Sequence, residues 1–169
     1  MKHIWRETKW RKFLDENWTI RKTGIYLRFD KSVDPDVKKC YMAFVKWLRK
    51  EFVFPLRLNV YVKDTYFIKA RDGDMVVGTF WRPPIGDSYP YMRLAVGDYT
   101  ELVSERGSEN AMWALLECFA HKITHYFQYI NDLDLTLIGE ERQAKRYSIM
   151  ILEEYDQYLD SLGLSLMDQ

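Results

Sequence analysis

The sequence predicts a single α+β domain over residues 1–169, in which a small, mostly antiparallel sheet packs against amphipathic helices. Two periodicities carry this prediction. Apolar residues recur every three to four positions over 37–52 and 108–131, which is the spacing of one helical face. Apolar and polar residues alternate over 56–63, which is the period of a strand with one buried and one solvated face.

The amino-terminal third predicts two helices and one strand. A short amphipathic helix is expected over 4–15, and the alternating residues 25–29 are expected to form a strand. Asp34 and Pro35 then mark a helix start, because an acidic N-cap is followed by proline at the first helical position. This helix is expected to continue to about Phe52.

The middle of the chain predicts strands and one long loop. The turn residues 71–74 precede the aromatic and β-branched segment 75–81, which is expected to be one strand of a hairpin. Three prolines and a glycine make 82–90 a loop. Residues 91–96 are expected to form the next strand.

Two long helices are expected to complete the domain. The first begins with Ser108 as its N-cap, ends near Asn131, and is apolar around much of its circumference, which indicates burial. The second runs from about Glu140 to Leu159, with acidic residues in its first turn where the helix dipole favours them. The tail from Ser161 onward is expected to fray.

Composition limits the compartment and the class of protein. No apolar run approaches the roughly 18–20 residues of a membrane span, so the chain is expected to be soluble and to have no membrane partner. The amino terminus has basic residues and no continuous apolar segment, unlike a secretory signal. Cys40 and Cys118 are the only cysteines, which fits a reducing compartment, and we expect the cytoplasm.

Charge is distributed unevenly along a chain of zero net charge. Residues 1–63 hold 16 Lys and Arg against 7 Asp and Glu, while residues 64–169 hold 9 against 18. One interpretation is a basic surface for nucleic acid or another acidic partner. The other is that the two halves pack together and neutralise each other. No continuous basic run or glycine-arginine tract supports nucleic acid, which is therefore the less favoured partner.

The strongest pattern with chemical content is a pair of histidines in the first long helix. His121 and His125 are four residues apart and lie one turn apart on one helical face, so both imidazoles can reach one metal ion. Glu141 lies on an apolar face of the last helix, where a carboxylate needs a partner. If the two helices pack together, the three side chains make a His2Glu set with an open fourth position, typical of catalytic zinc. The alternative is two core histidines bonded to neighbours.

These residues also carry a resemblance. The sequence HKITH followed by ERQAKRY resembles the HExxH and E-x-x-A-x-x-F/Y pair of gluzincin-type zinc metallopeptidases, especially the small ImmA/IrrE-like peptidases of bacteria and mobile elements. The motifs cover about 40 residues, 120–159, and the rest of the chain matches only in the order of its elements. The resemblance implies a minimal zincin-like fold, a protein or peptide substrate, and a strand over 91–96 that pairs with extended substrate. It implies Ala144 as the small residue between the helices. The zinc ligands that it implies are His121, His125 and Glu141.

The chain departs from that pattern at Lys122, which occupies the position of the general-base glutamate. A lysine ammonium cannot accept a proton from metal-bound water, and its charge repels the metal. Hydrolysis is therefore expected to be impaired or absent. Glu117 and Glu140 are the carboxylates near enough in sequence to replace the base. Gln128, one turn beyond His125, is expected to support the ligand from behind.

Two explanations of Lys122 stay open. The chain is either an inactivated or variant copy of a working peptidase, or a non-enzymatic interaction protein. In the second case Lys122 pairs with Glu141 or Glu140, with its cation in part of the metal's place. Such a pseudopeptidase would use the former substrate groove or the basic amino-terminal half to bind its partner.

Overall fold

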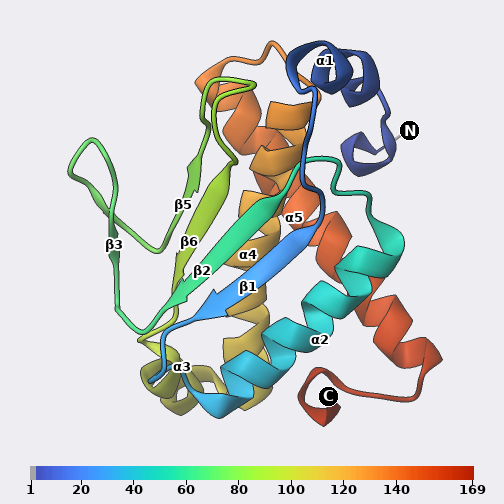
Figure 1. The fold of residues 1–169 in the computed structure, drawn as a ribbon. Coiled ribbons are helices and arrows are strands. Elements are labelled where there is room, and N and C mark those ends of the chain that lie inside the picture. The colour runs from blue at the N-terminus through green and yellow to red at the C-terminus, as the bar shows by residue number, and fades with distance from the viewer. Residues whose placement is uncertain (1–2) are drawn as a thin grey trace.

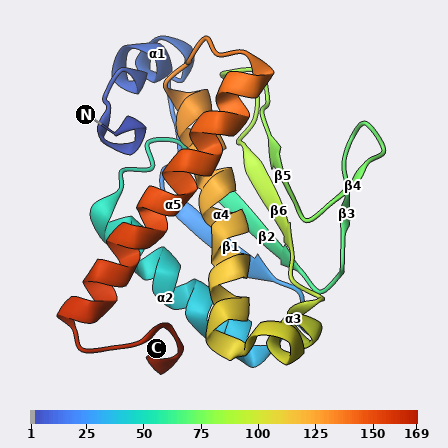
Figure 2. The ribbon, with the colours of Figure 1, turned by 180° about the vertical axis from the view of Figure 1, so that it is seen from behind.

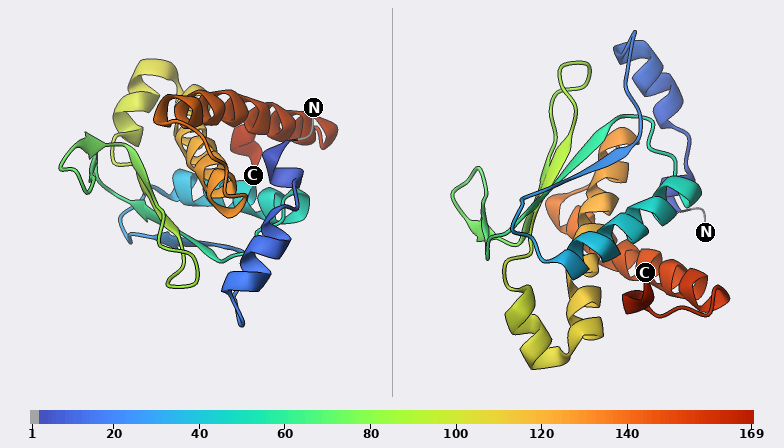
Figure 3. Two further views of the ribbon diagram at one scale, coloured as in Figure 1. Left: turned by 90° about the horizontal axis from the view of Figure 1, so that it is seen from above. Right: turned by 60° about the horizontal axis from the view of Figure 1, so that its bottom comes forward.

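A four-stranded sheet with helices on one side forms the body of the computed structural model, which describes residues 3–169. Figures 1 and 3 show helices behind the sheet, and Figure 2 shows α5 (Leu137–Ser161) lying across α4 (Ser108–Ile130) on the side away from the strands. The sheet has the order β1-β2-β6-β5, from Ile25–Phe29, Leu58–Lys63, Tyr91–Ala95 and Gly78–Trp81. The helices behind the sheet are α2 (Pro35–Glu51), α4 (Ser108–Ile130) and α5 (Leu137–Ser161). The α+β class predicted from the sequence is confirmed.

The core lies between the sheet and α4, and the sequence periodicities explain it. Strand β2 alternates buried and half-buried residues, so that Leu58, Val60 and Val62 all face the helices. Helix α4 is buried around most of its circumference, as its apolar composition predicts, because it has the sheet on one side and α5 on the other. Helix α4 is therefore the element that fixes the positions of its neighbours.

The expectation of a mostly antiparallel sheet is wrong. Strand β1 pairs with β2 in parallel, β2 pairs with β6 in parallel, and only β5 with β6 is antiparallel. Helix α2 is the reason for the first pair, because a helical crossover returns the chain in the same direction. The chain then leaves the sheet after β2 and re-enters it at β6, again in that direction.

The expected single strand over 75–81 is two strands in different sheets. Residues Met75–Val76 (β4) pair with Ile68–Lys69 (β3) across the predicted turn, so the hairpin is confirmed there. Val77 separates β4 from β5, which turns to pair with β6 instead. Figure 1 shows the β3–β4 hairpin projecting away from the main sheet.

Several helix boundaries also differ from the sequence-based expectation. The sequence analysis missed α3, Tyr99–Arg106, an eight-residue helix with no side-chain cap. This helix ends at Gly107, whose φ of 81° suits glycine, so Ser108 is the first residue of α4 and not its cap. Helix α5 begins three residues before Glu140, because Thr136 accepts a hydrogen bond from the Gly139 amide and caps it.

The first and last segments of the described chain are packed against the core. The expected helix over 4–15 is a 3₁₀ turn at Ile4–Arg6 followed by α1, Trp10–Asn17, because Trp5 is held between Phe52 and Tyr147. The tail does not fray: Leu166 is 1% exposed, in a 3₁₀ turn over Leu166–Asp168. Within the part of the chain that the structure describes, no helix has the length and apolarity needed to cross a membrane.

Candidate metal centre

The three predicted ligands meet where α5 crosses α4. One nitrogen of each imidazole and one carboxylate oxygen all lie within 4.8 Å of one another. His121 Nε2 is 2.9 Å from Glu141 Oε2, and His125 Nε2 is 3.1 Å from Glu141 Oε1. Ala144 is fully buried and has no bulk to hold the helices apart. Donors bound tetrahedrally at zinc distances of about 2.0–2.1 Å lie roughly 3.3 Å apart, and the two His–Glu distances, which end on different oxygens of Glu141, are near this value.

The electrostatics of the site leave both imidazoles neutral near pH 7. Burial lowers the pKa of His125 to about 4, against the opposing effect of its hydrogen bond to Gln128. Burial also lowers the pKa of His121, and the nearby Lys122 ammonium lowers it further. A neutral imidazole has one nitrogen with a free lone pair, which is the form that binds a metal.

Gln128 fixes the tautomer of His125. The Gln128 Nε2 donates to the carbonyl oxygen of Glu140 at 3.0 Å and to Gln143 Oε1 at 2.9 Å, so the hydrogen-bond network assigns Oε1 to the side facing His125. That oxygen lies 2.8 Å from His125 Nδ1, which must therefore carry the proton. The Nε2 lone pair is left facing the Glu141 carboxylate, and two acceptor atoms at 3.1 Å need a cation or a proton between them.

Arg82 is a further part of the site that the sequence analysis missed. It follows strand β5 and its guanidinium binds both carboxylate oxygens of Glu140, at 2.8 and 3.0 Å. One of its nitrogens is also 3.4 Å from His125 Nδ1, but both atoms carry protons and no hydrogen bond forms. Nothing in the local sequence distinguishes Arg82, since its role depends on the distance between β5 and α5. With its carboxylate held in this way, Glu140 is not a free base.

Lys122 forms no ion pair with Glu140 or Glu141, the carboxylates considered as its partners in one of the two explanations. Among residues 3–169 its Nζ has no carboxylate oxygen within 4.0 Å, while Glu140 is paired with Arg82 and Glu141 with the two histidines. The Lys122 side chain instead runs past Gly78 of β5, where its Cε lies 3.3 Å from the position of an added Cβ. The reason is helical geometry, since Lys122 is turned about 100° from His121 on α4. The pairing of Lys122 with Glu141 or Glu140, which belonged to one of the two explanations left open, is therefore absent from the described residues.

A groove runs between β5 and α4 next to His121. Its volume is about 400 Å³, and its lining includes Lys122, Glu117, Cys118 and the Val76–Gly78 segment. Glu117 is exposed there, one turn before His121, and is the only carboxylate among the lining residues. The groove thus brings His121, the Lys122 cation and one exposed carboxylate together.

The strand that borders this groove is not the one expected. Strand β6, which covers the predicted substrate-pairing residues, lies between β2 and β5 and has both edges paired. Strand β5 is the edge strand, and its far side is free of a strand partner in the described chain. The backbone groups that can pair with an added strand therefore belong to Gly78–Trp81.

Comparisons of the chain with protein-family models, with curated proteins and with solved structures find no match.

Proposed function

We propose that this chain is a zinc-binding, metallopeptidase-like protein that holds extended peptides and hydrolyses them weakly or not at all. His121, His125 and Glu141 are the proposed zinc ligands. The single observation that carries the proposal is the Nε2 lone pair of His125 facing a Glu141 oxygen at 3.1 Å, with Gln128 holding the proton on the opposite ring nitrogen. A bound cation removes this repulsion and satisfies all three donors.

The impairment is proposed from the residues around the open coordination position. Bound zinc supplies a Lewis acid and lowers the pKa of a coordinated water. In the motif that this chain resembles, a glutamate at position 122 takes the proton from that water, and Lys122 as an ammonium cannot. Glu140 is held by Arg82, which leaves Glu117 as the one free carboxylate of the groove.

The proposed substrate class follows from the edge strand. An extended peptide can add to the free edge of β5, where backbone hydrogen bonds hold it without regard to sequence. This addition lays the peptide over the groove and past His121. Both cysteines are free, which fits the cytoplasm as the proposed compartment.

The first experiment measures zinc content after chelation and reloading. The wild-type protein is expected to hold about one zinc per chain, and His125→Ala is expected to lose it because two donors do not make the site. His3→Ala is the matched control, since His3 stacks on Trp5 far from α5's first turn and is expected to leave zinc content unchanged. A wild-type protein that binds no zinc would overturn the proposal.

Two substitutions at Lys122 distinguish the effect of its positive charge from the effect of the missing general-base carboxylate. Lys122→Gln removes the repulsion, so zinc affinity is expected to rise while hydrolysis of an unfolded protein such as casein stays absent. Lys122→Glu also restores the base, and zinc-dependent hydrolysis is expected to appear, because general-base catalysis contributes about 10²–10⁴-fold. If Lys122→Glu binds zinc and cleaves nothing, the non-enzymatic interaction protein becomes the better description.

A further inference from the structure

The face of the main sheet that is turned away from α2, α4 and α5 has an unusual composition. Figures 1 and 3 show that these helices all lie on the other side. We call this surface the open face and define it by the outward, solvent-accessible side chains of the four strands. They are Tyr26 and Arg28 of β1, Asn59, Tyr61 and Lys63 of β2, Tyr91 and Arg93 of β6, and Thr79 and Trp81 of β5.

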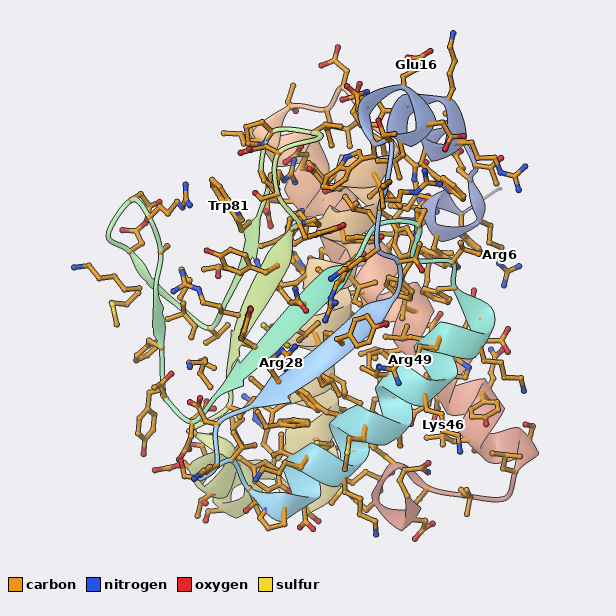
Figure 4. The ribbon with its side chains drawn as sticks, in the orientation of Figure 1. Arg6, Glu16, Arg28, Lys46, Arg49 and Trp81 are labelled. Atoms are coloured by element: carbon orange, nitrogen blue, oxygen red, sulfur yellow. The ribbon has the colours of Figure 1, made fainter. Side chains whose placement is uncertain are left out.

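Aromatic rings and cations dominate the open face. Four of its nine side chains are aromatic, three are cationic, two are neutral and none is acidic. Strand register places Tyr26, Asn59, Tyr91 and Trp81 in one row across the sheet, and Arg28, Tyr61, Arg93 and Thr79 in the next. Figure 4 looks onto this face and labels Arg28 and Trp81. An ordinary solvated sheet face mixes both signs of charge, so the composition needs a reason.

The arginines of this surface have no acidic partners. Within residues 3–169, no carboxylate lies within 4.0 Å of Arg28 or Arg93, nor of Arg57 and Arg71, which flank the face. Arg57 lies over the Tyr26 ring at 4.3 Å and Arg71 over the Trp81 ring at 3.2 Å. Their guanidinium planes are thus presented next to aromatic rings with their charge unneutralised. Only Lys63 is paired, at 3.0 Å from Asp30.

A hollow beside Trp81 could receive one planar group. Its volume is about 290 Å³, and it lies between the β3–β4 hairpin and the strands. Trp81, Tyr91, Arg71 and Arg93 are among its lining residues. Arg93 is held there by hydrogen bonds to Thr79 Oγ1 at 3.3 Å and to the Lys69 carbonyl at 3.2 Å. The hollow therefore combines ring faces with a fixed cation.

The distribution of charge over the molecule agrees with an anionic partner for this face. Only one ion pair between Lys or Arg and Asp or Glu, Arg6 with Glu154, joins the basic and acidic halves among the described residues. The two halves therefore do not neutralise each other by direct pairing. Of the cations of residues 1–63, Arg28, Arg57 and Lys63 lie on or beside the open face, and of these three only Lys63 is paired with a carboxylate.

We propose that the open face binds single-stranded nucleic acid. The solvent-accessible rings, and the guanidinium planes that lie over two of them, stack with unpaired bases, and the cations among them contact the phosphates. A duplex hides its base faces and offers only its phosphates to a flat sheet, so a single strand is the better partner. An acidic protein would use the charge and leave the rings without a role. This activity goes beyond the proposed metal centre, which lies on the other side of the sheet.

The test is fluorescence anisotropy with labelled oligo(dT) and oligo(rU) of about 12 nucleotides, within the usual site range of 4–16. Wild-type protein is expected to bind both, with a slope of log K against log salt of about −3 for four phosphate contacts. Arg28→Glu with Arg57→Glu is expected to weaken binding at least about tenfold and to make the slope shallower by about 1.4. Tyr61→Leu is expected to weaken binding about tenfold with the slope unchanged.

The controls distinguish this surface from general attraction of charge. Lys46→Glu with Arg146→Glu makes the same change of charge on α2 and α5 and is expected to leave affinity within about twofold. A chelator is expected to have no effect, so failure of the zinc site does not decide this test. Equal binding of an abasic oligomer, tighter binding of a duplex or of poly-glutamate, or loss of binding in the Lys46 and Arg146 variant would each overturn the proposal.

Discussion

At the residue scale, the histidine pair is set by helical spacing, but its protonation is set by Gln128. The side chain of Gln128 is 1% exposed and its amide is fully used, by His125 on one side and by Glu140 and Gln143 on the other. A buried amide with all its partners in place holds one rotamer. The orientation of the His125 lone pair is thus a property of three side chains on two helices.

Gln128→Leu is predicted to lower zinc affinity by about 10–100-fold, because His125 Nδ1 loses the acceptor that fixes its tautomer. Competition with a chromophoric chelator measures the affinity, and circular dichroism checks that the variant is folded. Gln143→Ala removes a partner of Gln128 without touching His125 and is expected to have a smaller effect. Equal affinities in Gln128→Leu and wild type would show that the amide does not orient the ligand.

At the element scale, the contact between β5 and α4 depends on Gly78. A Cβ at this position would lie 2.9 Å from Cys118 Sγ and 3.3 Å from Leu94 Cδ2. A side chain at residue 78 therefore requires the Cys118 side chain or strand β5 to shift. The sequence shows only a glycine between Val77 and Thr79, and its role appears only when the strand is packed against the helix.

Gly78→Ala is predicted to destabilise the fold by about 1–3 kcal/mol through overpacking against Cys118. Cys118→Ala in the same chain removes the sulfur and is expected to recover most of that loss. Urea unfolding of the four proteins of the cycle measures the coupling. Additive effects of the two substitutions would mean that the strand moves away without contacting Cys118.

At the scale of the whole molecule, the carboxyl-terminal tail closes the core below α2 and α4. Leu166 is a member of the buried core, and its carbonyl oxygen lies 3.6 Å from the thiol sulfur of Cys40. The tail stands at the end of the chain, and a sequence-based prediction therefore treats it as free. In the structure it covers residues that would otherwise face water.

Leu166→Ala is predicted to lower the free energy of unfolding by about 2–5 kcal/mol, as for other buried leucines. The matched control is Leu162→Ala, in the same tail but 52% exposed, with an expected change below about 0.5 kcal/mol. Urea denaturation with a common slope gives both values. Similar small losses in the two variants would indicate that the tail frays in solution.

The part of the fold that local pattern encodes was predictable. Asp34 caps α2 through its hydrogen bond to the Asp36 amide, as the sequence indicates, and the buried positions of β2 follow the alternation of its residues. The parallel direction of β1 and β2 follows from the helix between them, which the sequence also predicts, so the expectation of a mostly antiparallel sheet overlooked this crossover. Helix α3 was missed because eight residues carry too little periodicity.

The candidate site also has a part that the sequence predicted and a part that only the packing of distant elements brings together. Helical spacing and motif order were enough to select His121, His125 and Glu141, since each depends on residues a few positions away. Arg82 was not predictable, because it lies 58 residues from Glu140 along the chain and reaches it only when β5 packs beside α5. The direction of Lys122 and the identity of the edge strand likewise depend on that packing.

By itself, the sequence determined the α+β class, most of the helices and strands, and three residues able to share one metal ion. Only the tertiary structure decided that Lys122 faces the strand edge, that Glu140 is bound by Arg82, and that the sheet has an open face of rings and arginines. The physical reason is the separation along the chain of the residues that interact. Periodicity records which side of an element avoids water, but pairing of distant elements decides which side chains meet.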